Sequence, residues 1–280
     1  VTYSGFASGE TAANALSGSV SYGGTAQNVI DASASTYSII PSGLSASNYT
    51  INYVNGALTV NPATLTVRIN NDARFVADSE SATYNGASYS GFVAKQTTAV
   101  LGGSLAISRS SSGPDSNLAG ANTQAGTYTG VLTGSGLTST NYTINYVPGN
   151  YTIVPADQLL VKMANIAATY GSNPAYSVTS ARYYRSSNST IYDLTSSVVL
   201  TGSSFSLADG AGGNTAFTLG ATTPSLSTAG QLNAGAYQVG ATSVTNSSIN
   251  YSNTITVTGA LQVNPKAVTA AVTSSVTSIN

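Results

Sequence analysis

Asn48-Tyr49-Thr50-Ile51-Asn52-Tyr53-Val54-Asn55-Gly56-Ala57-Leu58-Thr59-Val60-Asn61-Pro62 is the stretch that decides the fold, because the chain repeats it. A second copy begins as Asn141-Tyr142-Thr143-Ile144-Asn145-Tyr146-Val147-Pro148-Gly149 and ends at Pro155. A looser third copy runs from Asn250 to Pro265. A unit that recurs within one polypeptide is typical of tandem modules, and it argues against one large active-site domain.

Apolar and polar residues alternate along the repeated stretch with the period of a half-buried β-strand. The alternation runs from Tyr49 to Tyr53 and resumes at Leu58. Between these halves, Asn55-Gly56 is a strong signal for a two-residue hairpin turn. The second and third copies carry Pro148-Gly149 and Thr258-Gly259 at the same place. The pattern therefore predicts that each module closes on a β-hairpin.

Prolines mark where one module follows another. Pro62 ends a strand and opens an alternating segment, Ala63-Thr64-Leu65-Thr66-Val67, and proline is tolerated at the first residue of a strand. From these landmarks we expect an incomplete module over residues 1–61 and complete modules over 62–154 and 155–264. Residues 265–280 have the pattern of the leading strand of a further module. The short connections predict a stiff, extended rod.

Short, regularly spaced strands with glycine-rich turns predict an all-β chain of small modules. The strands fit a β-sandwich and a β-grasp-like fold equally well. Only Gly9–Ala15 favours a short helical turn. A continuous β-helix is the rival architecture, but its coils recur at about 20 residues, and no such shorter period lies inside the modules.

The composition restricts the classes of function. Only 6% of the 280 residues are charged, against about 25% in ordinary globular proteins, while 41% are hydrophobic. The eight basic residues are scattered and the net charge is −1, which argues against a nucleic-acid partner. No apolar run approaches the roughly 18 residues of a membrane span, so we expect no membrane insertion by this segment.

Catalytic chemistry has few candidate groups. The chain contains no His and no Cys, so imidazole, thiolate and disulfide chemistry are excluded, and we expect no enzyme activity and no cofactor. Oxygen ligands for calcium exist at Asp209–Asn214 and around Asp72, Asp78 and Glu80. Neither group has the dense spacing of a calcium loop, and we expect no metal site.

An insertion over residues 181–193 is the best candidate for a binding surface. It gathers Arg182, Tyr183, Tyr184, Arg185 and Tyr192 in the longest module. Arginine and tyrosine are enriched at binding hot spots, and flat aromatic faces suit sugars. The same pattern also fits an exposed β-hairpin whose tyrosines pack across strands, and this simpler interpretation is favoured.

The two ends of the chain are out of register with the modules. Residues 1–61 begin at a Tyr-Ser-Gly-Phe landmark and lack the leading strand of the other modules. The simplest interpretation is a window of a longer repetitive protein. The alternative is that residues 265–280 complete the deficient first module of another copy, which would join chains head to tail through backbone hydrogen bonds.

Three short motifs carry a family resemblance: Tyr170-Gly171, Tyr84-Asn85-Gly86 and the closing Asn48-Tyr49-Thr50-Ile51. With them the chain resembles the MBG-type repeats of filamentous-haemagglutinin-like bacterial surface adhesins. The first motif fits the YGX variety of these repeats, the second is similar to the YDG variety, and the third fits the closing strand. The resemblance implies a secreted protein at the bacterial cell surface or in the extracellular matrix, active in cell adhesion or biofilms. There such repeats form a stalk or filament, and the implied partners are neighbouring repeats of the same protein and surface glycans. It supplies no catalytic residues.

Overall fold

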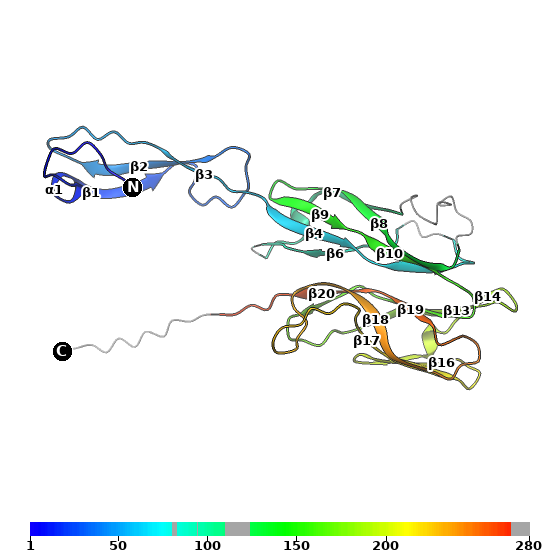
Figure 1. The fold of residues 1–280 in the computed structure, drawn as a ribbon. Helices are drawn as coiled ribbons and strands as arrows, with labels where there is room; N and C mark the ends of the chain where they lie inside the picture. The colour runs from blue at the N-terminus through cyan, green and yellow to red at the C-terminus, as the bar shows by residue number, and fades with distance from the viewer. Residues whose placement is uncertain (80–82, 94, 110–123, 270–280) are drawn as a thin grey trace, which may run out of the picture. The chain divides into compact units, whose positions relative to one another are not determined.

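The computed structural model describes residues 1–79, 83–93, 95–109 and 124–269. The chain divides into two compact units. The first unit comprises Val1–Thr64 and Thr138–Thr143, and the second comprises Leu65–Leu137 and Ile144–Asn280. Both units are all-β, as the sequence predicts (Figure 1).

The first unit contains one helical turn and one antiparallel three-stranded sheet of order β1-β2-β3. Its elements are α1 (Ala12–Ala15), β1 (Ser17–Gly23), β2 (Tyr37–Ser45) and β3 (Gly56–Leu58). The four-residue helix α1 lies inside the segment for which a helical turn was predicted, and the side chain of Asn14 accepts a hydrogen bond from the Thr11 amide.

A pair of glycines bends the sheet at the same place in the first and second repeats. Gly18 and Gly43 face each other across β1 and β2 with φ of +87° and +93°. A Cβ on Gly18 would lie 2.4 Å from the carbonyl oxygen of Gly43. Gly103 and Gly136 repeat this arrangement, with φ of +74° and +90°. Only glycine adopts this left-handed backbone without strain, so the two repeats share one bend.

Two sheets form the second repeat. One has the order β6-β4-β9 and the other has the order β5-β10-β8-β7. The elements are β4 (Ala63–Ile69), β5 (Asp72–Phe75), β6 (Ala87–Ser90), η1 (Thr98–Val100), β7 (Gly102–Arg109), β8 (Gly126–Thr138), β9 (Tyr142–Val147) and β10 (Gly149–Val154). The predicted alternation holds along β4, where Leu65, Val67 and Ile69 are at most 1% exposed.

Two larger sheets enclose the core of the third repeat, in the orders β14-β13-β11-β19 and β12-β20-β18-β17-β16-β15. Their elements are β11 (Leu159–Met163), β12 (Ile166–Thr169), β13 (Val178–Arg185), β14 (Thr190–Asp193), η2 (Thr195–Ser197), β15 (Val198–Thr201), β16 (Ser204–Ala208), β17 (Asn214–Ala221), β18 (Gly235–Asn246), β19 (Ile255–Thr258) and β20 (Ala260–Asn264). Buried side chains from both sheets, such as Val161, Phe205 and Val239, share one cluster. Two sheets over a common core are the two-layer arrangement of a β-sandwich.

The leading strand of each complete repeat is divided between the two sheets of that repeat. It breaks at Asn70-Asn71 in the second repeat and at Ala164-Asn165 in the third. The first half, β4 or β11, lies in one sheet. The second half, β5 or β12, pairs in parallel with the last strand of the repeat, β10 or β20. The leading strand therefore ties the two layers together.

The predicted closing hairpin is wrong. The repeated stretch forms two consecutive strands, β9 and β10, but they lie in different sheets, as do β19 and β20. A Cβ on Gly149 would lie 2.6 Å from the carbonyl oxygen of Ile69, and one on Gly259 would lie 2.6 Å from Cβ of Met163. The glycine is needed because the leading strand crosses closely there, and the chain changes sheets at this point instead of turning back.

The short, mostly antiparallel sheets exclude the β-helix rival. The boundaries at residues 62, 155 and 265 stay a prediction, because the second and third repeats share one compact unit. Residues 265–269 are exposed and belong to no strand, and residues 270–280 lie outside the described part of the chain. Within that part, no helix is long and apolar enough to cross a membrane.

Candidate binding surface and repeat junction

The insertion over residues 181–193 is a β-hairpin formed by β13 and β14. Tyr183 pairs with Tyr192, and Tyr184 pairs with Ile191. The structure therefore has the β-hairpin that the sequence favoured. Alternate residues of β13 point to opposite faces, so the two arginines and two tyrosines in a row divide between two environments.

One face of this hairpin packs on the core of the third repeat. The rings of Tyr183 and Tyr192 stack with centroids 4.9 Å apart and planes 8° apart. The Arg185 guanidinium lies 5.8 Å from the first ring centroid and 5.2 Å from the second, close enough for a cation–π attraction. Tyr183 is only 3% exposed, and burial raises the pKa of its hydroxyl. Of this pair, only Tyr192 is accessible to a ligand.

The opposite face of the hairpin lies against the second repeat. Arg182 forms an ion pair with Asp78 at 3.3 Å, and its guanidinium lies 5.9 Å from the ring centroid of Phe75. Tyr184 also contacts Phe75, with ring centroids 6.4 Å apart. Arg182 and Tyr184 therefore form contacts between the second and third repeats, within the second unit. The sequence did not predict these contacts.

A shallow hollow of about 570 Å³ adjoins the exposed side of Arg185. Asp157, Ser186, Asn250 and Ser252 are among its lining residues. The Ser186 hydroxyl and amide donate hydrogen bonds to the Asp157 carboxylate at 2.5 and 3.0 Å. The pKa of Asp157 is lowered, chiefly by the hydroxyl bond and then by the amide bond. The hollow is therefore polar and carries a charged carboxylate.

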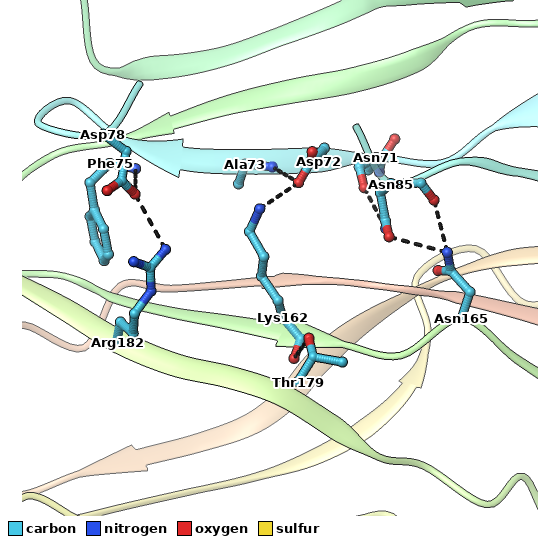
Figure 2. Close-up of polar contacts among 10 residues, drawn as sticks. All are labelled: Asn71, Asp72, Ala73, Phe75, Asp78, Asn85, Lys162, Asn165, Thr179 and Arg182. Carbon is cyan, nitrogen blue, oxygen red and sulfur yellow. Dashed lines mark hydrogen bonds and ion pairs between the residues drawn. The ribbon is translucent and has the colours of Figure 1, made fainter. Parts of the chain in front are cut away.

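Among the residues that the structure describes, two ion pairs cross the junction between the second and third repeats. Besides Arg182 and Asp78, Lys162 on β11 donates to the Asp72 carboxylate on β5 at 2.8 Å (Figure 2). The Asp72 side chain is 5% exposed and that of Lys162 is 28% exposed. Because the aspartates and their basic partners are far apart in sequence, only the folded chain brings them together. The signal available in the sequence was the interruption of the apolar alternation at Asn70-Asn71.

An apolar cluster lies at the same junction. Ala73, Phe75 and Val154 from the second repeat contact Leu160 from the third, and each is at most 1% exposed. Leu159, the preceding residue, belongs instead to the core of the third repeat. Strand β11 is therefore buried on both faces, one within its own repeat and one against the neighbour.

Side-chain amides complete the junction at the breaks of the two leading strands. Asn165 donates to the backbone oxygen of Asn85 at 2.8 Å (Figure 2). Its side-chain oxygen accepts from the Ala260 amide at 3.0 Å. The Gln238 side chain accepts from the Asn71 amide at 2.8 Å. Where the leading strands break, backbone groups lose their partners in the sheet, and these side-chain amides hydrogen-bond to them across the junction. The bonds fix the position of one repeat against the other.

Asp209, considered above as a calcium ligand, holds a loop in place. Its carboxylate accepts from the amides of Ala211 and Gly213, each at 2.8 Å, and from Ser248 and Asn250 at 2.5 and 3.2 Å. Burial alone would raise its pKa, but these hydrogen bonds outweigh it and lower the pKa. No group of three or more acidic, His or Cys side chains with metal-site spacing occurs among the described residues, and Glu80 lies outside them.

The first repeat has three recurring features. These are the segment Tyr3–Phe6, the bend at Gly18 and Gly43, and the stretch Asn48–Gly56, which contributed to the resemblance to MBG repeats. Residues 1–59 match the MBG domain (YGX type). The predicted family is thus confirmed for the first repeat. No curated protein and no solved structure matches the chain.

The second repeat shares residue-level geometry with this MBG domain. Tyr53 accepts a hydrogen bond from the Leu44 amide at 2.7 Å, and Tyr146 accepts one from the Leu137 amide at 2.9 Å. The paired glycines described above provide a second shared feature. The likeness of the second repeat to the MBG domain of residues 1–59 rests on these two features.

Proposed function

We propose that this MBG-domain-containing chain is a structural segment, a stalk or filament, of a secreted bacterial surface adhesin, and that it is not an enzyme. MBG domains are typical of surface proteins, which supports a location at the cell surface or in the extracellular matrix. The partners proposed for it are neighbouring repeats of the same protein, and the alternation of small β modules suits extension and load bearing.

The junction between the second and third repeats carries this proposal. A stalk needs repeats that keep a fixed orientation, and a linker of flexible residues would not provide it. Here two ion pairs, a cluster around Leu160 and side-chain amides join consecutive repeats within one compact unit. Domain interfaces that are apolar and continuous with the cores resist relative motion.

The test measures how fixed the two repeats are. Because the chain has no Cys, the Ser104→Cys/Ser203→Cys variant carries two spin labels at exposed sites, one in each repeat. Electron–electron double resonance should give one narrow distance distribution. Leu160→Ala should broaden it, because the cluster at the junction is lost.

Leu159→Ala is the matched control, since it makes the same truncation one residue away on the opposite face of β11. It should lower the stability of the third repeat by about 2–5 kcal/mol and leave the distribution narrow. A broad distribution in the labelled chain without further substitution would contradict the stalk proposal.

A glycan-binding role for residues 181–193 is the second candidate, favoured by the polar hollow beside Arg185. Since Tyr183 and Tyr184 pack internally, a sugar would use Tyr192. Tyr192→Ala should then reduce binding to immobilised bacterial and host glycans at least tenfold, while Tyr128→Ala in the second repeat should not. Glycan binding that is absent, or unaffected by Tyr192→Ala, would exclude this role.

A further inference from the structure

The first and last strands of the third repeat lie side by side and run in the same direction. The leading strand is β11 followed by β12, and the closing strand is β19 followed by β20. β11 pairs in parallel with β19 over four residue pairs, beginning at Leu159 and Ile255. β12 pairs in parallel with β20 over four more, ending at Thr169 and Asn264. The leading and closing strands therefore stay paired through both sheets of the repeat.

The backbone hydrogen bonds of this pairing can be assigned along β12. The Tyr170 amide, just beyond β12, donates to the backbone oxygen of Asn264 at 2.8 Å. Successive amides of a strand point to opposite sides, so the Ala168 amide is also directed toward β20 and the Ala167 amide is directed away from it. Because β12 is the edge strand of its sheet, the Ala167 amide has no strand on its side.

Buried side chains cover the paired strands. Leu159, Val161 and Leu261 are 0% exposed and Val263 is 3% exposed. All four belong to the core cluster of the third repeat, to which both sheets contribute. Backbone hydrogen bonds under a packed core open less readily than solvent-exposed ones. The pairing between the first and last strands is therefore protected from water.

The second repeat has the same pairing between its first and last strands. There β5, the second half of the leading strand, pairs in parallel with β10, from Tyr151↔Asp72 to Val154↔Phe75. The Val76 amide extends this pairing by donating to the backbone oxygen of Val154 at 3.0 Å. Phe75 and Val154 are fully buried. Parallel pairing of the leading strand with the final strand is thus common to both complete repeats.

This pairing decides how a repeat responds to tension. The chain enters the third repeat at the start of β11 and leaves it at the end of β20. Tension along the chain pulls these two points in opposite directions, which slides one parallel strand along the other. The hydrogen bonds between the two strands then share the load and must break together. A pull that peels the strands apart breaks the same bonds one after another and needs less force, because forced unfolding depends on the height of the barrier that is crossed.

We infer that the paired leading and closing strands are a mechanical clamp, by which the second and third repeats each bear tension along the chain. The clamp of the third repeat consists of β11, β12, β19 and β20, and that of the second repeat includes β5 and β10. The biological use of the clamp rests on the stalk proposal, since a stalk transmits tension. The clamp itself lies inside each repeat, whereas the stalk proposal concerns the junction between repeats, so either can fail without the other.

Force spectroscopy of the full chain in two pulling directions tests the clamp of the third repeat. Because the chain has no Cys, two introduced cysteines fix where the handles are attached. Gln158→Cys/Lys266→Cys places the handles at opposite ends of the clamp and loads it in shear. Ser172→Cys/Lys266→Cys places both handles at one end, just beyond β12 and β20, and peels these strands apart. All three positions are exposed or partly exposed. At the same loading rate, the first variant should rupture at several times the force of the second.

Two proline substitutions in β12 test whether the hydrogen bonds to β20 bear the load. Proline has no amide hydrogen, so Ala168→Pro removes a donor to β20 and should clearly lower the rupture force in shear. Ala167→Pro is the matched control, because proline is tolerated where an edge strand directs its amide away from the sheet. It should leave the rupture force close to that of the chain with handles alone. Circular dichroism of both variants checks that they fold.

Two results would overturn the inference. These are equal rupture forces in the two pulling directions, and equal losses of rupture force in the two proline variants. If Ala168→Pro does not fold, the comparison of pulling directions decides alone, since it leaves β12 unchanged. The spin-label experiment reports separately on the junction. A fixed junction together with equal rupture forces would remove the clamp and leave the stalk proposal standing.

Discussion

At the scale of the residue, the few charges of this chain are used at specific contacts. Only 6% of the residues are charged, yet Asp72, Asp78, Lys162 and Arg182 all form ion pairs across one repeat junction. A buried carboxylate is costly unless a cation or hydrogen-bond donors compensate it. The junction therefore combines apolar burial with ion pairs that allow only one arrangement of the two repeats.

Lys162→Met should destabilise the second unit, because it leaves the nearly buried Asp72 carboxylate without its cation. We expect a loss of about 1–2 kcal/mol, reduced from the cost of a fully buried pair because Lys162 is 28% exposed. Lys162→Met/Asp72→Asn should recover part of the loss. Urea unfolding measures both, and equal losses in the single and double variants would contradict this.

Asp209 should make the third repeat sensitive to acid. Its pKa is lowered in the folded state, so its stabilising effect is fully present above the unfolded pKa of about 3.9 and is lost as pH falls through the folded pKa. Asp209→Asn should reduce the slope of unfolding free energy against pH below about pH 4. An unchanged slope in this variant would show that other carboxylates cause the acid sensitivity.

At the scale of the element, the leading strand decides which other segments become strands. It is divided between two sheets, with β4 and β5 in the second repeat and β11 and β12 in the third. Its neighbours β6 and β9 gain their pairing from it, and the final strand of each repeat gains a parallel partner. A change at the crossing point should therefore disturb both layers.

Gly149→Ala and Gly56→Ala form a matched pair that tests this crossing. The new methyl at position 149 would lie within 3 Å of the backbone oxygens of Ile69 and Asn70, so we expect a loss of about 1–3 kcal/mol. At position 56 the nearest contact is ordinary, and the loss should be below about 1 kcal/mol. Thermal or urea unfolding measures both, and equal effects would contradict the proposed crossing.

At the scale of the whole molecule, burial is unequal between the two units. Every fully buried apolar side chain among the described residues lies at Leu65 or beyond. Amides of residues 1–59 should consequently exchange with deuterium faster than those of β11 and β18, since exchange protection follows local stability. Equal protection of the amides in the two units would contradict this prediction.

Much of the fold follows from patterns that can be read locally. The alternation of Leu65, Val67 and Ile69 predicted a strand with one buried face, and β4 has it. The hairpin at residues 181–193 was also anticipated. The change of sheets at Gly149 and Gly259 was not anticipated, and a closing hairpin was predicted there instead. The reason is that a glycine suits a tight turn and the close passage of another strand equally well.

The sequence by itself determined the repeats, the all-β class and the MBG character of residues 1–59, because alternation and recurring landmarks depend only on order along the chain. Only the tertiary structure decided that Tyr-Thr-Ile-Asn-Tyr-Val is a strand in one repeat and not in another, and that Leu159 faces a core while Leu160 faces a neighbouring repeat. Strand pairing and burial depend on a partner distant in sequence, and identical local sequences cannot encode different partners.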